Sequence, residues 1–341
     1  MDQLKKNKPV SAVGLDIGSY SVKCVELTHT GETVQLHRAS ILPAKDPESL
    51  KTILKLIFDP SHTTPSRVRI AVSGPSLLVR RITLPTMTVG ELKSAIRFEA
   101  ESHLPFPVDD CVLDFQILGQ EPDKKTMHVM LVAVKRDTVA ARLELLASLN
   151  IHPEIVDADI FCLLNAFEML GDSGSERAYG LLNIGHRMSS FAILHDRVPF
   201  FVREIPFGGA QITQALAEIR QIPEPDADAL KHERSAEILD DLRAATQKGF
   251  EPLAEQIEHS IDYYENEVGE DLKHLWMSGG AALSYGASEV LSAELEKEVT
   301  IWDNIRKIES FENVDQKFLA QHSAELNVAF GMILRGVGQR K

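Results

Sequence analysis

Two apolar segments far apart in the chain share one pattern of hydrophobic and polar positions. The pattern occurs at Val13 to Lys23 and again, more weakly, at Leu181 to Phe191. In each copy a short apolar strand leads to a polar side chain, Ile-Gly, hydroxyl-bearing residues and a second strand. The glycine permits a tight backbone reversal in which consecutive N–H groups point at one anion. We expect the two turns to face each other and to hold one nucleotide between them.

The repetition extends into the segments that follow the turns. A hairpin is predicted after the first turn, over 21–27 and 33–42, and a matching hairpin after the second, over 189–194 and 198–205. A turn-rich segment around Gly174 separates the two copies. The chain is therefore predicted to form two related α/β lobes around a cleft.

Helical patterns complete the lobes and interrupt the first of them. Asp46 and Pro47 start one predicted helix, and the capping-box spacing of Thr88 and Glu91 starts another. Strands over 111–118 and 126–134 and a helix capped by Asp137 follow, so these later elements are predicted to form a small inserted α+β subdomain. The predicted divisions are 10–84 for the first lobe, 85–150 for the inserted subdomain, 151–178 for the return to the first lobe, 179–325 for the second lobe and 326–341 for a closing helix.

Composition and charge narrow the class of protein. The chain has 341 residues, 44% of them apolar, which is enough for two lobes with separate cores. A formal net charge of -14 disfavours nucleic acid as a partner, because a duplex attracts a basic surface. The cysteines and histidines lack metal-ligand spacing, so no zinc site is expected. The apolar run from Val10 to Val13 is too short for a membrane span, and any membrane contact is expected to come through a partner.

A resemblance to known proteins rests on the two turns and on three further stretches. The turns, together with the later Gly279-Gly280-Ala281 turn, resemble the actin-like ATPases over almost the whole chain. Within that class, the stretch from Glu91 to Phe106 and the closing segment from Ala329 to Arg335 are similar to the PilM family of cytoplasmic assembly proteins in type IV pilus machines. The resemblance implies an actin-like ATPase fold with a cleft that binds ATP and Mg²⁺.

The resemblance also implies the residues of that cleft. Asp16 is implied as the metal ligand and a catalytic residue. In the connection between the lobes, Asp157 or Asp159 is a further catalytic candidate that positions a water. The implied nucleotide contacts are Gly18, Ser19, Tyr20, Ser21 and Lys23 in the first turn, Asn183, Gly185, Met188 and Ser189 in the second, Gly208 and Gly209 beneath the phosphates, Asp228 and Lys231 near the nucleoside, and Gly279, Gly280 and Ala281 against the adenine and ribose. Glycines suit these positions because a side chain would hold the backbone away from the ligand.

Some of these residues have an alternative interpretation. Lys23 could be an exposed strand lysine, and the stretch around Asp228 a solvated loop. Asp157 and Asp159 could be a strand-end carboxylate and a helix N-cap. These alternatives remain open at the level of sequence.

Asn183 departs from the pattern, since many relatives carry a second aspartate there. At about 4 Å, each pair of unit charges contributes on the order of 1 to 4 kcal/mol, doubled for a divalent cation, before hydration offsets it. The substitution therefore predicts that ATP binds and that hydrolysis is slow. The alternative is that Asp16 alone organises Mg²⁺ through its retained waters.

The resemblance further implies a partner. The resemblance implies that the short cytoplasmic N-terminal segment of PilN binds beside the inserted subdomain. It also implies a position at the inner face of the bacterial inner membrane, among other pilus assembly proteins. A homo-oligomer is compatible with this position. A short peptide needs apolar pockets and a few polar anchors. The candidate groove residues are Arg80, Arg81, Arg97, Phe98, Leu104 and Phe106, with core packing as the alternative for Phe98 and Leu104.

Two other functions fit the same fold. A small-molecule kinase would need a second pocket with a base near a hydroxyl, and the chain shows no distinct sugar-recognition motif. An FtsA-like filament would need an amphipathic terminal anchor, and the segment 336–341 is too short and glycine-rich for one. The favoured hypothesis is an assembly platform whose lobe arrangement depends on ATP.

Overall fold

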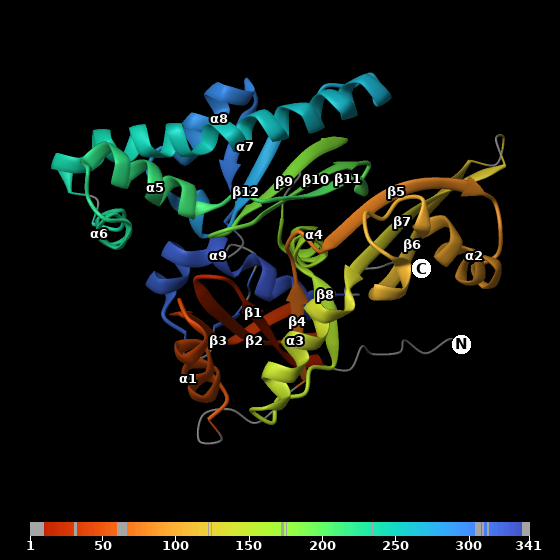
Figure 1. Ribbon diagram of the computed structural model, residues 1–341, viewed down its shortest axis with the longest axis horizontal. Helices are drawn as coiled ribbons and strands as arrows, with labels where there is room; N and C mark the ends of the chain where they lie inside the picture. Colours follow the sequence, from red (N-terminus) through yellow and green to blue (C-terminus); the bar gives the residue numbers. More distant parts are fainter. Residues whose placement is uncertain are drawn as a thin grey trace.

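Two sheets with the same strand arrangement form the two lobes (Figure 1). The computed structural model describes residues 10–30, 33–59, 67–121, 123, 125–171, 174, 176–233, 235–303, 308, 310–311 and 314–335. The sheet of the first lobe has the order β14 (Ser310–Phe311), β3 (Thr33–Pro43), β2 (Ser21–Thr30), β1 (Val10–Ile17), β4 (Arg67–Val72) and β8 (Ile155–Ala158). The sheet of the second lobe has the order β11 (Val198–Ile205), β10 (Ser189–His195), β9 (Ala178–Ile184), β12 (His274–Ser278) and β13 (Glu298–Ile301).

The two sheets repeat each other strand by strand. β1 pairs antiparallel with β2 and parallel with β4, while β9 pairs antiparallel with β10 and parallel with β12. β3 and β11 then extend the antiparallel side, and β8 and β13 the parallel side. The predicted duplication is confirmed, and it extends over every strand described in the sheet of the second lobe.

A smaller sheet stands beside the lobes and carries one helix on its outer face. Its order is β5 (Leu77–Pro85), β7 (Thr126–Lys135) and β6 (Cys111–Glu121), and the helix is α2 (Val89–Glu101). Thr88 and Glu91 form the predicted capping box of α2. The predicted boundary after residue 84 is wrong for this sheet, because β5 pairs with β7 from Leu77 onward and belongs to the inserted subdomain.

Helix α3 (Arg136–Ala147) follows β7 directly but packs on the first lobe. Leu146 is fully buried in the core that also contains Leu15 and Ile70 of β1 and β4. Asp137 does not cap this helix as predicted, because the helix already begins at Arg136. The Asp137 carboxylate instead lies in the first turn, where its negative charge interacts favourably with the positive end of the helix dipole.

The remaining outer helices cover the lobes. They are α1 (Pro47–Ile57) on the first lobe, and α5 (Gly209–Arg220), α6 (Glu224–Leu230), α7 (Leu239–Val268) and α8 (Ala287–Leu295) on the second. Asp46 caps α1 as predicted, accepting hydrogen bonds from the amides of Glu48 and Ser49. No described helix combines the length and apolar character that crossing a bilayer requires.

Two helices, α4 (Asp159–Leu170) and α9 (Gln316–Leu334), lie between the two sheets (Figure 1). They pack so closely that a Cβ at Gly331 of α9 would overlap the carbonyl oxygen of Cys162 in α4. α9 also presses on β1, where a Cβ at Gly14 would overlap the carbonyl oxygen of Ala329. Backbone contact at both points fixes the position of α9 against β1 and α4.

A shared core and a buried arginine hold this layer in place. One hydrophobic cluster contains residues of both sheets as well as α4 and α9, and Phe167 at its centre has ring centroids 5.2 Å from Tyr179 and 4.9 Å from Trp302. Arg69 of β4 donates hydrogen bonds to the carbonyls of Met332 and Ile333, at 3.2 and 2.9 Å. These carbonyls lie in the last turn of α9, where a cation also favours the helix dipole.

The substitution Gly331→Ala is expected to destabilise the protein by about 1–3 kcal/mol or more, because the added methyl group must displace the backbone of α4. Thermal unfolding of the purified variant measures the change. The matched control is Gly90→Ala in α2, where the nearest atom to the new Cβ is 3.9 Å away. The control is expected to leave stability unchanged or raise it by up to about 1 kcal/mol, and a Gly331→Ala variant as stable as wild type would contradict the close helix contact.

Candidate functional site

The two predicted turns lie at the cleft between the lobes and face each other. The rings of Tyr20 and His186, one from each turn, have centroids 4.9 Å apart. In the β-ladders, Asp16 stands opposite Lys23 and Asn183 stands opposite Ser190, the same position in each copy. The duplicated strands therefore bring two equivalent backbone reversals close together between the lobes.

Both turns close in the same way. The amide of Gly18 donates to the carbonyl of Ser21, and the amide of Gly185 to the carbonyl of Met188, each at 3.0 Å. Ser19 is exposed at the tip of the first turn. These bonds confirm that each glycine sits at a tight reversal.

The other glycine loops pack directly on the second turn. A Cβ at Gly208 would overlap the backbone of His186, and a Cβ at Gly279 would overlap the carbonyl oxygen of Ile184. Gly279 also has a φ of 91°, a conformation that a residue with a side chain rarely adopts. Gly208 and Gly279 are thus required because the loops pack against each other. This reason differs from the predicted one, which was the close approach of a ligand.

Asp16 and Lys23 form an ion pair beside the first turn. The distance from Lys23 Nζ to Asp16 Oδ2 is 3.0 Å, and the side chains are only 15% and 11% exposed. Burial lowers the pKa of the Lys23 ammonium, but the charge of Asp16 and more distant carboxylates raise it, and the net pKa is raised. Lys23 is therefore a buried cation of the cleft, and the alternative of an exposed strand lysine is wrong.

The two aspartates at the junction of β8 and α4 face different sites. Asp157 accepts a hydrogen bond of 3.0 Å from Arg335 and lines a groove outside the cleft. Burial and the charge of Asp16 raise the pKa of Asp159 to about 6. Because α4 begins at Asp159, the two carboxylates do not share a side as they would in a continuing strand. Of the two aspartates considered for positioning a water, Asp157 is paired with Arg335, while Asp159 interacts with the charge of Asp16.

The predicted nucleoside end bridges the lobes. Lys231 Nζ donates to Thr213 Oγ1 at 2.7 Å and to Asp228 Oδ1 at 3.3 Å. Asp228 Oδ2 accepts from Tyr20 at 2.9 Å and from Lys45 at 2.7 Å, both in the first lobe. Burial raises the pKa of Asp228, but these donors outweigh it and the pKa falls to about 2. The stretch is part of α6 and not a solvated loop; Lys45 was not predicted, since no local motif marks it.

Of the remaining residues that were predicted to contact the nucleotide, some lie near the cleft and others are buried in the second lobe. Gly280 faces a carboxylate of α9, since a Cβ there would lie 3.2 Å from Glu325 Oε2. Ala281 is buried against the start of α5, 3.2 Å from the Cβ position of Gly209. The Ser189 hydroxyl donates to the carbonyl of Phe207 at 2.9 Å in a buried position, so it is already used within the second lobe.

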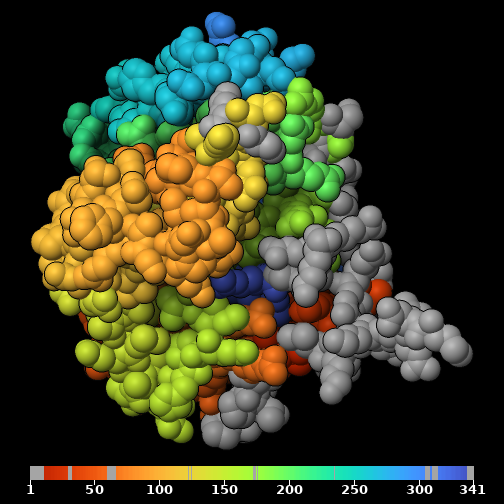
Figure 2. Space-filling view, turned by 90° about the vertical axis from the view of Figure 1, so that its right-hand side faces the viewer, coloured from red at the N-terminus to blue at the C-terminus, as the bar shows by residue number. Residues whose placement is uncertain are grey.

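A groove of about 1300 Å³ lies between the inserted sheet, α4 and the β10–β11 hairpin. Figure 2 shows this side of the molecule, with the inserted subdomain in orange and yellow in front of the junction of the lobes. The groove combines apolar walls with a few charges; its lining includes Val112, Phe115, Phe161, Leu164, Asp157 and Arg335. The lining of the groove therefore comes from both lobes and from the inserted subdomain.

The residues predicted for a partner groove lie elsewhere. None of Arg80, Arg81, Arg97, Phe98, Leu104 and Phe106 lines it. For the α2 stretch, the reason is the alternation of side chains along β7: Val129 and Leu131 pack under α2, whereas Val132 and Val134 line the groove. The α2 stretch thus covers the opposite face of the inserted sheet, where Phe98 is 81% exposed.

Comparison with known proteins agrees with this architecture. The family model for the type IV pilus assembly protein PilM matches residues 14–337. The chain belongs to the PilM family. It is similar to a solved structure described as the PilM-PilN type IV pilus biogenesis complex, with 25% identity and a TM-score of 0.82 over 96% of this chain and 99% of that chain. It is also similar to the ethanolamine utilization protein EutJ from Carboxydothermus hydrogenoformans, with 14% identity and a TM-score of 0.58 over 96% and 90% of the two chains. The fold is the actin-like ATPase fold, as predicted.

Glu204, near the end of β11, is a residue of the cleft that was not predicted. Its Oε2 accepts a hydrogen bond of 3.2 Å from the amide of Gly74, which belongs to the other lobe. Burial raises the pKa of Glu204 to about 7, and the charge of Asp159 contributes to the increase. The only sequence signal was a carboxylate within the apolar strand Val198–Ile205.

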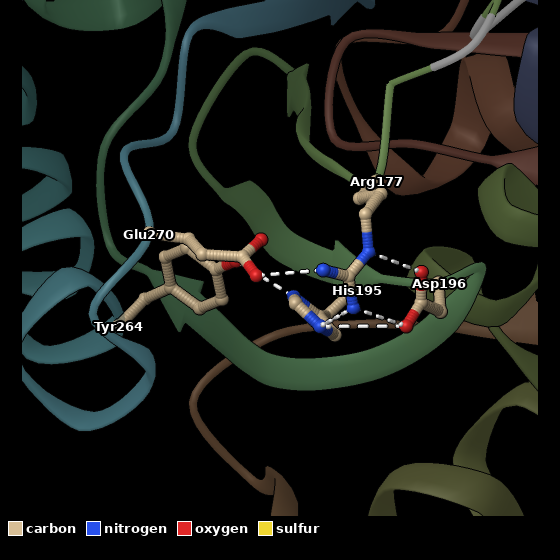
Figure 3. A network of polar contacts seen from close by, with 5 residues as sticks. All are labelled: Arg177, His195, Asp196, Tyr264 and Glu270. Carbon is tan, nitrogen blue, oxygen red and sulfur yellow. Dashed lines mark hydrogen bonds and ion pairs between the residues drawn. The ribbon is translucent and has the colours of Figure 1, made fainter.

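The β10–β11 hairpin that walls the groove is held by a network of charges. Figure 3 shows its members, Arg177, His195, Asp196, Tyr264 and Glu270. Asp196 and Arg197 occupy the hairpin turn with φ of 49° and 66°, a conformation that favours glycine or asparagine. Arg177 supports this turn by donating to both carboxylate oxygens of Asp196, at 3.0 and 2.9 Å, and to Glu270 at 2.7 Å. The network ties the groove wall to the loop after α7.

The substitution Glu204→Gln is expected to raise stability at pH 8 by on the order of 1–3 kcal/mol, and to lose this effect by pH 5. A folded pKa of about 7, above the ordinary 4.5, means that the protonated carboxyl favours folding; this contribution is complete below pH 4.5 and is lost as the pH rises through 7. Glutamine mimics the protonated form and keeps an acceptor for Gly74. Thermal unfolding at both pH values measures the difference.

The control for this experiment is Glu251→Gln, an exposed position of α7. It is expected to leave stability within about 0.5 kcal/mol at either pH. A Glu204→Gln variant that is less stable than wild type at pH 8 would show that the ionised carboxylate is needed for the contact with Gly74.

Proposed function

We propose that this protein is an ATP-binding assembly platform of the type IV pilus machine. Its cleft binds the nucleotide, and its groove binds the N-terminal cytoplasmic segment of PilN, which holds the protein at the inner face of the bacterial inner membrane. The observation that carries the proposal is the approach of the two duplicated turns, whose rings at Tyr20 and His186 are 4.9 Å apart. The similarity to a PilM-PilN complex supports the partner.

The charges of the cleft support a nucleoside triphosphate as the ligand. Lys23 lies beside the first turn and Lys231 beside the glycine loop at the start of α5, where the Gly209 Cβ position is 4.0 Å from its ammonium. In each case the ammonium is paired with a carboxylate, and a phosphate oxygen can take the place of that carboxylate. Lys23 would then bind the phosphates from the first lobe, and Lys231 the phosphate nearest the nucleoside from the second lobe.

The residues also fit a hydrated Mg²⁺ ion. Within the described ranges no group of three or more His, Cys, Asp or Glu side chains is arranged to hold a metal. Mg²⁺ often takes only one or two carboxylates and completes its shell with water and phosphate oxygens, so Asp16 is sufficient on the protein side. When bound, the ion neutralises phosphate charge.

Slow hydrolysis of ATP is expected from the side chains that would surround the phosphates. Asn183 supplies an amide oxygen where a carboxylate would attract a cation more strongly. Asp159 can accept a hydrogen bond from water once it is ionised, above its pKa of about 6. We therefore propose that nucleotide binding, more than hydrolysis, sets the state of the protein.

The groove fits a short extended peptide. Its apolar residues suit hydrophobic anchors, and the Asp157–Arg335 ion pair at its edge offers one acceptor and several donors to a peptide backbone. Its volume of about 1300 Å³ accommodates several side chains. A PilN segment bound here would contact both lobes and the inserted subdomain.

Cleft and groove meet at the junction of β8 and α4. Asp157 faces the groove and Asp159 faces the cleft, with Ala158 between them as the N-cap of α4. A shift of this junction on nucleotide binding would move Asp157 and its partner Arg335. The nucleotide can therefore change the affinity for PilN to the extent that it binds the two lobe arrangements differently.

ATP with Mg²⁺ is expected to bind the wild-type protein and raise its melting temperature by a few degrees at 100 times the dissociation constant, a gain of about 2.7 kcal/mol. Lys23→Ala is expected to weaken ATP binding by about tenfold or more, since it removes a charge-assisted contact. Calorimetry measures both. Lys55→Ala, an exposed position of α1, is the control and is expected to bind ATP as wild type does. Absence of ATP binding by wild type would reject the nucleotide cleft.

A synthetic peptide with the N-terminal sequence of PilN is expected to bind the wild-type protein. Val112→Arg is expected to weaken it by about tenfold or more, because Val112 is 41% exposed in the groove wall and a bulky charge there blocks the apolar site. Fluorescence anisotropy of a labelled peptide gives both affinities. Phe98→Ala is the control on the opposite face of the inserted sheet. If Phe98→Ala weakens binding and Val112→Arg does not, the α2 face predicted from the sequence is the binding site.

A further inference from the structure

Arg142 brings a further cation into the cleft from the inserted segment. Its Nη2 donates a hydrogen bond of 3.0 Å to the carbonyl of Ile17, the residue immediately before Gly18 of the first turn. Arg142 lies on α3, whose Leu146 is fixed in the core of the first lobe, so the base of the side chain has a defined position. The guanidinium therefore reaches the first turn from a helix that was predicted to serve only the inserted subdomain.

The surroundings of Arg142 are acidic. Burial lowers the pKa of its guanidinium, and the charges of Asp159 and Asp16 raise it. Arginine remains charged in such an environment, and its fork has five N–H donors, of which the carbonyl of Ile17 uses one. Further donors are thus available to an anionic ligand that enters between the two carboxylates.

The position of Arg142 differs from that of the other cations of the cleft. Lys23 is paired with Asp16 along the strands that flank the first turn, and Lys231 is paired with Asp228 at the predicted nucleoside end. The charged neighbours of Arg142 are Asp159 and Asp16, which belong to the first lobe and the start of α4. A triphosphate whose nucleoside lies near Lys231 would present its far end to Arg142.

We propose that Arg142 binds the terminal phosphate of a nucleoside triphosphate and makes the cleft distinguish ATP from ADP. This inference rests on the proposed nucleotide site. The guanidinium fork of an arginine matches the oxygens of a terminal phosphate. Its positive charge also offsets the two neighbouring carboxylates, which would otherwise repel the phosphate. ADP lacks this phosphate and does not engage the fork.

The contact also connects the nucleotide to the groove. β7 ends at Lys135 and α3 begins at Arg136, so Arg142 is joined without a loop to the central strand of the inserted sheet. Val132 and Val134 of that strand line the groove. Through α3, Arg142 thus links the inserted sheet to the phosphate that is present in only one nucleotide state.

The test compares ATP and ADP affinities of Arg142→Gln in the presence of Mg²⁺ by calorimetry. Glutamine keeps a polar side chain with N–H donors but is shorter than arginine and carries no charge. ATP affinity is expected to fall by about 10–100-fold while ADP affinity changes by less than about threefold, and Arg142→Lys is expected to recover part of the loss. Intact ADP binding also shows that the variant is folded.

The control on the same helix is Arg136→Ala, whose side chain is exposed and donates to the carbonyl of Asp109; it is expected to keep the wild-type ratio of ATP to ADP affinity. An unchanged ratio in Arg142→Gln, or an equal loss of both nucleotides, would overturn the inference while leaving the nucleotide site intact. If wild type binds neither nucleotide, the proposed function fails instead. Should Arg142→Gln not fold, phenylglyoxal modification of wild type decides the question, since ATP but not ADP is expected to protect Arg142.

Discussion

Close packing of α4 and α9 between the two sheets is the constraint on which the rest of the structure depends. At Gly331 and Gly14 the chain leaves no room for a side chain, so helix backbone rests on helix and strand backbone. Contacts of this kind cannot be compressed, and they fix α9 against β1 and α4 in the layer between the sheets. The two duplicated turns, the glycine loops and the bridge from Asp228 to the first lobe are arranged around this layer.

The cleft that results is a site of paired charges. Asp16 with Lys23, and Asp228 with Lys45 and Lys231, satisfy each other across short distances in a partly desolvated space. Charges in such a space interact more strongly than in bulk water and cost free energy if left unpaired. In the proposed complex, a phosphate ligand would exchange partners with these carboxylates and would alter contacts that now hold the lobes together.

The inserted subdomain uses both faces of one sheet for different purposes. One face is covered by α2 and contributes to a small core of its own, while the other forms a wall of the groove. From the same sheet, α3 continues into the first lobe and carries Arg142 to the first turn. The groove and the cleft are thus connected by two short paths, through α3 and through the junction at Asp157 and Asp159.

The sequence by itself determined the elements whose signals are local. The two Ile-Gly turns, the capped helices at Asp46 and Thr88, and the hairpins after each turn follow from backbone freedom, capping and alternation, and all of them are present. The duplicated turns and the Gly279-Gly280-Ala281 turn also indicated the actin-like fold, through their resemblance to the actin-like ATPases. These features depend on residues within about one turn or one hairpin of each other.

The tertiary structure alone decided which side chains meet. Asp157 and Asp159 are two residues apart and equally acidic, yet the start of α4 sends one to the groove and the other to the cleft. Glu204 and Lys45 reach the cleft from segments without a motif, and the apolar residues of α2 cover the face of the inserted sheet opposite the groove. Such contacts depend on the packing of elements distant in sequence, and no local pattern of hydrophobic and polar positions encodes that packing.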